Sequence, residues 1–194
     1  MTTETSPPPS TSSLLIPPGG PLIWGVVVME MFTFGIAMVL FMHSGRDEPE
    51  IYRSGRQQLQ LAFGLANTAL LLTSGYFMAE AVERYRRRAN ARFLISIAAA
   101  GGILFLIVKA IEYSAKVRAG LTLGADTFHT YYWLLTGFHV LHVVIGVILL
   151  CVICRRLHPD AKPLEPEDVE AGAVFWHMCD LIWLVLFPVI YLLP

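Results

Sequence analysis

The sequence is poor in charged residues. Asp, Glu, Lys and Arg make up 15% of its 194 residues, whereas soluble domains carry about 25%. Hydrophobic residues make up 55%, which is typical of a membrane protein. The formal net charge is −1, so the chain lacks the basic surface that binds nucleic acid. We expect membrane lipid around the protein and no nucleic acid among its partners.

The sequence has few cysteines and lacks the pattern of a signal peptide. The three cysteines include Cys151 and Cys154, a C-x-x-C pair at the end of an apolar run. Packing as small hydrophobic residues is the favoured interpretation and metal or redox use the alternative. Residues 1–20 are rich in Ser, Thr and Pro but contain no Lys or Arg. A signal peptide needs a positive segment followed by an apolar core, so we predict a disordered N-terminal tail.

What the sequence does contain is long apolar runs. A bilayer core about 30 Å thick takes roughly 20 helical residues, and five runs qualify, at 22–42, 59–82, 93–113, 128–154 and 171–193. They must be helices because lipid cannot hydrogen-bond to an open backbone. The predicted fold is all-α, a polytopic membrane protein in which residues 21–194 form a bundle of five transmembrane helices. Loops of at most 16 residues leave no stretch able to fold outside the bilayer.

Orientation follows from the basic residues in the loops, since cytoplasmic loops carry more Lys and Arg. The second and fourth loops hold eight such residues. The first and third loops hold five. We therefore expect a cytoplasmic N-terminus and an external C-terminus. The eight are Arg84, Arg86, Arg87, Arg88, Arg92, Arg155, Arg156 and Lys162.

Several ionisable residues lie inside the predicted spans, at roughly 9–22 Å from the cytoplasmic helix ends. Such residues are costly and usually face the bundle interior, a partner or water. Burial disfavours a charged carboxylate, so Glu30 is expected to be protonated. It either hydrogen-bonds to a histidine or a backbone carbonyl, or exchanges protons with the cytoplasm. The set comprises Glu30, His139, His142, His177 and Asp180.

His139 and His142 occupy adjacent positions on one helix face. One helix cannot supply both axial ligands of a haem. The Glu-x-x-His pairs of di-metal carboxylate sites do not occur in these spans. We therefore expect both rings to form interhelical hydrogen bonds, and no metal or cofactor bound by this chain. Lys109 and Glu112, three residues apart, predict a local ion pair whose lysine reaches outward.

Small residues are placed where helices can approach closely. They are the Ala98–Gly102 segment, Gly137 and Gly146. Two other classes of function stay open at this point. One is a small haem b or quinol protein that uses His139, His142 and His177. The other is a proton-coupled transporter, although the sequence has no inverted repeat or pair of broken helices of the kind that such folds use.

Three segments carry a family resemblance. TGFHVLHVVIG (136–146) resembles the Gly-Phe-His-x-Leu-His-Val motif of cytochrome c oxidase subunit III. EAGAVFWHMCDLIWLVLFPVIYLL (170–193) resembles that family's closing helix, with its Trp-His-x-x-Asp-x-x-Trp pattern. WGVVVMEMFTFGIAMVLFMHS (24–44) resembles the helix that carries the family's buried glutamate, here Glu30. Shorter matches, NTALLLTSGYFMAEA from residue 67 and IEYSAK from residue 111, keep the family order.

The resemblance implies an accessory subunit that is not catalytic alone and binds no haem or copper. It would pack against the haem- and copper- or iron-bearing catalytic subunit of a respiratory terminal reductase in the bacterial plasma membrane. Glu30 would then support proton uptake by that subunit, while Glu112 and the other buried polar residues would serve packing. Longer members have seven helices, with lipid in a cleft after the second. The sequence matches the last five helices, so we expect that cleft to be missing. Among five-helix members it is most similar to the branch associated with nitric oxide reductase.

Overall fold

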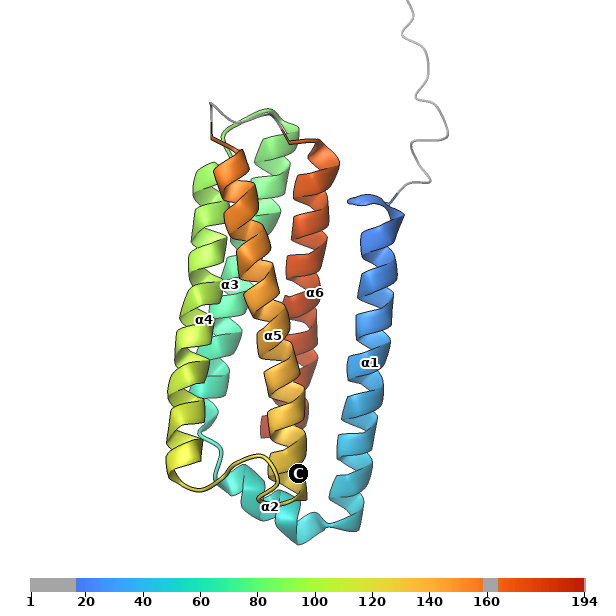
Figure 1. Cartoon of the computed structure of the whole chain (residues 1–194), viewed down its shortest axis with the longest axis vertical. Helices are drawn as coiled ribbons and strands as arrows, with labels where there is room; N and C mark the ends of the chain where they lie inside the picture. The colour runs from blue at the N-terminus through green and yellow to red at the C-terminus, as the bar shows by residue number, and fades with distance from the viewer. Residues whose placement is uncertain (1–16, 159–163, 194) are drawn as a thin grey trace, which may run out of the picture.

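The computed structural model describes residues 17–158 and 164–193 (Figure 1). Most of the tail predicted for residues 1–20, and Lys162, lie outside this part. Five helices are long and apolar enough to cross a membrane, and the described residues contain no strand. The all-α fold with five spans is therefore confirmed. The helices are α1 (Gly20–Asp47), α3 (Leu61–Arg86), α4 (Arg92–Arg118), α5 (Thr127–Arg156) and α6 (Pro166–Tyr191), with a short α2 (Pro49–Gln57).

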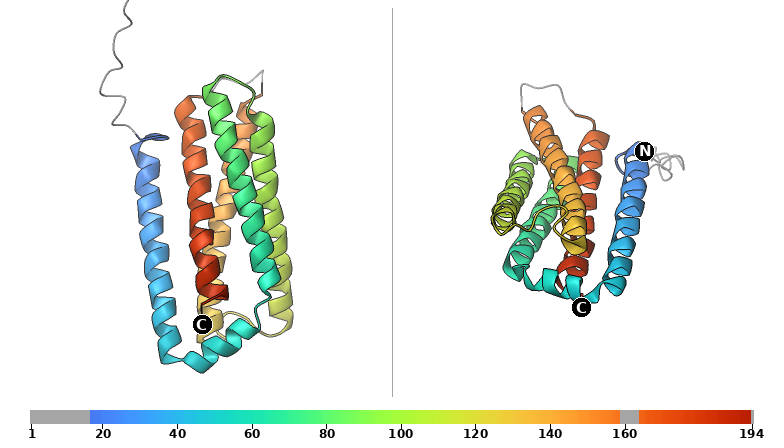
Figure 2. Two further views of the ribbon diagram at one scale, coloured as in Figure 1. Left: turned by 180° about the vertical axis from the view of Figure 1, so that it is seen from behind. Right: turned by 60° about the horizontal axis from the view of Figure 1, so that its bottom comes forward.

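The long helices run up and down in one bundle. Helices α3 to α6 surround a shared core, and α1 stands at one edge, against α5 and α6 (Figures 1 and 2). Helix α2 crosses the end of the bundle between α1 and α3 and packs on α5. The arrangement brings the start of α1 to the same end of the bundle as the ends of α3 and α5.

A chain of hydrogen bonds from a buried tryptophan joins three helices. The Nε1 of Trp176 on α6 donates to the hydroxyl of Ser74 on α3 at 3.0 Å. That hydroxyl donates to the carbonyl of Ala98 on α4 at 2.7 Å. Since lipid tails are as apolar as the side chains, membrane helices associate through close packing and such interhelical bonds. Trp176 is therefore an anchor of the bundle.

Close packing around Trp176 depends on two glycines. A Cβ on Gly102 would overlap the Trp176 ring, and a Cβ on Gly146 would lie 2.7 Å from its Cε3. The predicted close approach is confirmed at both positions. At Gly137 the same prediction is wrong, because nothing lies within 4 Å of a built Cβ. That position faces open space on the outside of α5.

Helix α2 corrects the expectation that no stretch folds outside the bilayer. The loop after α1 is long enough for a short helix that begins at Pro49, where proline is well tolerated. Tyr52 is 1% exposed because its ring packs against Phe41 and Phe128, with centroids 5.0 and 5.4 Å away. Burial raises the pKa of the Tyr52 phenol above its usual range. The helix thereby closes this end of the bundle.

The two glycines on α5 give a matched test of this packing. Gly146→Ala should lower the stability of the bundle by about 1–3 kcal/mol, because the added methyl overlaps a ring that has no room to move. Gly137→Ala should leave stability unchanged or raise it slightly, since alanine favours the helix. Thermal unfolding in detergent measures both. Equal melting temperatures for the two variants would contradict the packing described here.

Candidate functional site

The buried Glu30 of α1 faces His142 of α5. Its Oε2 lies 3.3 Å from the ring Nε2, and the two residues are only 9% and 6% exposed. The other ring nitrogen, Nδ1, lies 2.8 Å from the carbonyl of Phe138. Because a carbonyl only accepts, Nδ1 carries a hydrogen and donates it. A neutral His142 therefore presents the lone pair of Nε2 to Glu30.

This tautomer fixes the protonation of the pair. Glu30 Oε2 has no hydrogen-bond partner among the described residues, so its approach to His142 Nε2 is a contact and not a formed hydrogen bond. Two facing lone pairs would repel, so the contact favours one proton between the two atoms. The pair is either a carboxylic acid beside a neutral imidazole, or a carboxylate beside an imidazolium. Aromatic rings of Phe34, Phe138 and Phe175 surround His142, with centroids 5.7, 4.7 and 6.3 Å away. Few polar groups can compete for the proton in such surroundings.

His139 lies one turn earlier on α5 but points elsewhere. It is fully buried, stacked on Trp183 at 5.3 Å and edge-on to Phe105 at 5.6 Å. Neither ring nitrogen has a hydrogen-bond partner among the described residues. The expectation of an interhelical hydrogen bond is therefore wrong for this histidine. It is wrong for His142 as well, whose ring hydrogen-bonds to Phe138 within α5 and only contacts Glu30. Positions three apart on a helix differ in direction by roughly 60°, so His142 faces α1 while His139 faces α4 and α6.

His177 and Asp180 form a separate pair on α6. The His177 Nδ1 lies 3.4 Å from the Asp180 Oδ2, on the side of α6 that packs on α3. A Cβ at Gly75 of α3 would collide with the same carboxylate, so only glycine leaves room for it. The predicted polar set is thus divided. Glu30 and His142 meet, His139 is in the core, and His177 and Asp180 lie at another interface.

A further polar cluster lies between α4, α5 and α6. Lys109 and Glu112 are 1% and 2% exposed, and Nζ lies 2.9 Å from Oε2. The hydroxyls of Tyr132 and Tyr191 donate to Glu112 Oε1 at 2.8 and 2.6 Å. The expected ion pair is present, but the expectation that Lys109 reaches outward is wrong. The tyrosines of two other helices complete its surroundings inside the bundle, where it lies 5.1 Å from the Trp183 ring centroid.

The sequence pointed less clearly to those tyrosines. Tyr132 lies near the start of α5 and Tyr191 at the end of α6, both at the end of the bundle where α4 finishes. Their depth in the membrane therefore matches that of Lys109 and Glu112, and this match was the signal in the sequence that could have found them. Within residues 17–158 and 164–193, no three His, Cys, Asp or Glu side chains gather in a way that could hold a metal ion. The three cysteines are all free, and Cys179 is buried.

Comparison with known proteins assigns the family. The family model described as "Cytochrome c oxidase subunit III" matches residues 26–193. The chain belongs to the cytochrome c oxidase subunit III family. The cytochrome c oxidase subunit 3 of Synechocystis sp. is 35% identical over 155 residues, which cover 74% of this chain and 65% of that protein. That of Corynebacterium diphtheriae is 27% identical over 147 residues, covering 72% and 70%.

The match confirms the family resemblance and places this subunit III chain among multi-pass membrane proteins. A relative from Mycosarcoma maydis is 31% identical over 178 residues, covering 85% of this chain and 62% of that protein. The chain therefore spans a little under two thirds of the length of the Synechocystis and Mycosarcoma relatives. The match includes α5 with His139 and His142, α6 with Asp180, and Glu30 of α1.

The Lys109–Glu112 pair should behave as a unit. Lys109→Met alone leaves a buried carboxylate without its cation and should cost about 3–5 kcal/mol of stability. The double variant Lys109→Met, Glu112→Leu should cost less than the single one, because no unpaired charge remains. A double-mutant cycle on unfolding in detergent measures the coupling. Additive losses would show that the two groups do not interact as described.

Proposed function

We propose that the chain is an accessory subunit of a respiratory haem–copper oxidase or nitric oxide reductase complex. It packs against the haem- and copper- or iron-bearing catalytic subunit in a bacterial plasma membrane and supports the stability and proton uptake of that subunit. The observation that carries this proposal is the contact of Glu30 with His142 inside a member of the subunit III family. The relatives are named as subunits of cytochrome c oxidase.

The pair is suited to hold a proton that the complex takes up. One proton placed between Glu30 and His142 would relieve the repulsion of the two facing lone pairs across 3.3 Å. A second proton would leave a buried positive charge, which the surrounding aromatic rings cannot solvate as water does. The pair is therefore suited to hold one proton and not two. In this proposal Glu30 exchanges the proton with groups outside the bundle, because α1 stands at its edge.

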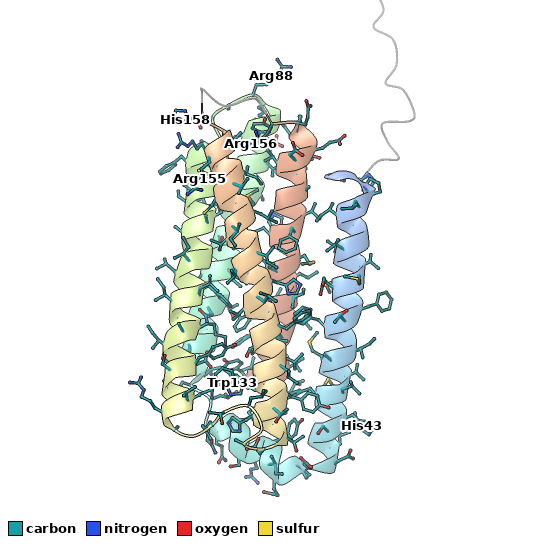
Figure 3. The ribbon with its side chains drawn as sticks, viewed as in Figure 1. His43, Arg88, Trp133, Arg155, Arg156 and His158 are labelled. Atoms are coloured by element: carbon teal, nitrogen blue, oxygen red, sulfur yellow. The ribbon has the colours of Figure 1, made fainter. Side chains whose placement is uncertain are left out.

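The arginines support a cytoplasmic position for one end of the bundle. Arg88, Arg155 and Arg156 gather at the end where α1 begins, and His43 and Trp133 lie toward the other (Figure 3). Since basic loops stay in the cytoplasm, the N-terminus is cytoplasmic and the C-terminus external in our proposal. Glu30 follows the start of α1 at Gly20 by roughly 15 Å along the helix. Glu30 therefore lies closer to the proposed cytoplasmic end of α1 than to its other end at Asp47.

The partner is tested by purification of the tagged chain from its native membrane in mild detergent. We expect a large haem-bearing membrane subunit to accompany it, seen in the visible spectrum and identified by mass spectrometry. The identity of that subunit distinguishes an oxidase from a nitric oxide reductase. A haem spectrum from this chain without a partner would overturn the accessory role and restore the histidines as ligands.

The role of Glu30 is tested by Glu30→Gln in the assembled complex. The substitution should leave the amount of complex unchanged, because an amide can still hydrogen-bond to Nε2 of His142. It should slow proton uptake during turnover, because the amide holds no exchangeable acid proton. Proton uptake by a pH-sensitive dye and haem content per chain measure the two effects.

Glu80→Gln provides the matched control. Glu80 pairs with Arg84 on the exposed surface of α3, where an ion pair contributes little. This variant should retain both proton uptake and assembly. Unchanged uptake in Glu30→Gln, or equal slowing in the two variants, would refute the proton-linked role.

A further inference from the structure

A small polar pocket lies at the end of the bundle where α4 finishes and α3 begins. Its volume is about 110 Å³, which is enough for a few water molecules or one small ion. Its walls include Glu112 and Lys116 of α4, Gln60 and Phe63 at the start of α3, and Leu121 of the loop after α4. That loop is held in place because Nε1 of Trp133 donates to the carbonyl of Leu121 at 2.9 Å (Figure 3).

The ammonium group of Lys116 is buried without a counter-ion of its own. Lys116 is only 5% exposed, and its Nζ lies 4.8 Å from the centroid of the Tyr132 ring. It forms no hydrogen bond or ion pair with another described residue. Lysine is almost never buried to this extent unless it is paired with an anion.

The carboxylate nearest to Lys116 is already used by other groups. Oε2 of Glu112 accepts from Lys109 at 2.9 Å, and Oε1 accepts from the hydroxyls of Tyr132 and Tyr191. Glu112 is also the one acid among the described residues that line the pocket. Two lysines therefore share one carboxylate, which leaves one positive charge in excess. The end of α4 favours a cation, but the partial charge of a helix end does not replace a counter-ion.

The start of α3 adds hydrogen-bond donors to the pocket. The first N–H groups of a helix have no partner within it, and together with the helix dipole they attract anions. The side chain of Gln60, which precedes the first residue of α3, does not cap these N–H groups. Lys116 and the start of α3 thus offer positive charge and donors to the same small space.

We propose that this pocket binds one small oxyanion, with Lys116 as its counter-charge and the start of α3 as a further source of donors. The chemical class is a phosphate group, either free inorganic phosphate or the headgroup of a phospholipid. A headgroup is within reach because α4, a candidate membrane span, ends at Arg118, two residues after Lys116. This site does not depend on the function proposed above.

Thermal unfolding of the delipidated full chain in a phosphate-free detergent tests the site. Inorganic phosphate is titrated at an ionic strength held constant with gluconate, an anion too large for the pocket. The melting temperature of the wild-type chain should rise with phosphate, because a ligand that binds only the folded state stabilises it. Lys116→Met should weaken the apparent affinity for phosphate by about tenfold or more, since a charged hydrogen bond is lost.

Arg118→Gln provides the matched control. It removes the same charge from an exposed position two residues later on the chain, and its response to phosphate should equal that of the wild-type chain. An unchanged response in Lys116→Met, an equal loss in Arg118→Gln, or no response of the wild-type chain would overturn the inference. If Lys116→Met does not fold, Gln60→Ala at its exposed position decides in the same way.

Native mass spectrometry of the chain purified from its membrane distinguishes the two sources of phosphate. One more phospholipid per chain in the wild type than in Lys116→Met assigns the site to a headgroup. Equal lipid content, together with the phosphate response of the wild-type chain, assigns it to free phosphate.

Discussion

Lipid cannot hydrogen-bond, and this constraint governs the rest of the structure. Each polar side chain inside the bundle must find a partner on another helix or remain unsatisfied at considerable cost. Trp176 meets Ser74, and Ser74 in turn bonds to α4. Lys109 and Glu112 meet two tyrosines. These contacts fix which faces of the helices turn inward, and the glycines around Trp176 then allow the backbones to close on it.

The same constraint connects structure to function. Glu30 and His142 come within 3.3 Å of each other across α1 and α5, and in our proposal this contact is also the site of proton exchange. Oδ1 of Asp180 remains without a hydrogen-bond partner among the described residues although it is buried. Polar groups that are paired within the chain stabilise it.

Much of the fold was predictable from hydropathy, because a transmembrane helix must be long and apolar throughout. Polar contacts were harder to predict. The sequence gives the depth of a residue along its helix, but not which neighbouring helix its side chain faces. His139 and His142 look equivalent in sequence, yet only one of them faces α1. Lys109 was expected to reach outward, because the tyrosines that surround it come from distant segments. Helix α2 was missed because a short amphipathic segment has no strong apolar signal.

An electron microscopy map of the complex purified from native membranes tests the central claim most directly. The account predicts this chain against a haem-bearing subunit, with Glu30 and His142 in contact and no cofactor density inside the five-helix bundle. Haem or metal density bound to His139 or His142, or this chain on its own in the membrane with no haem-bearing subunit against it, would contradict the account.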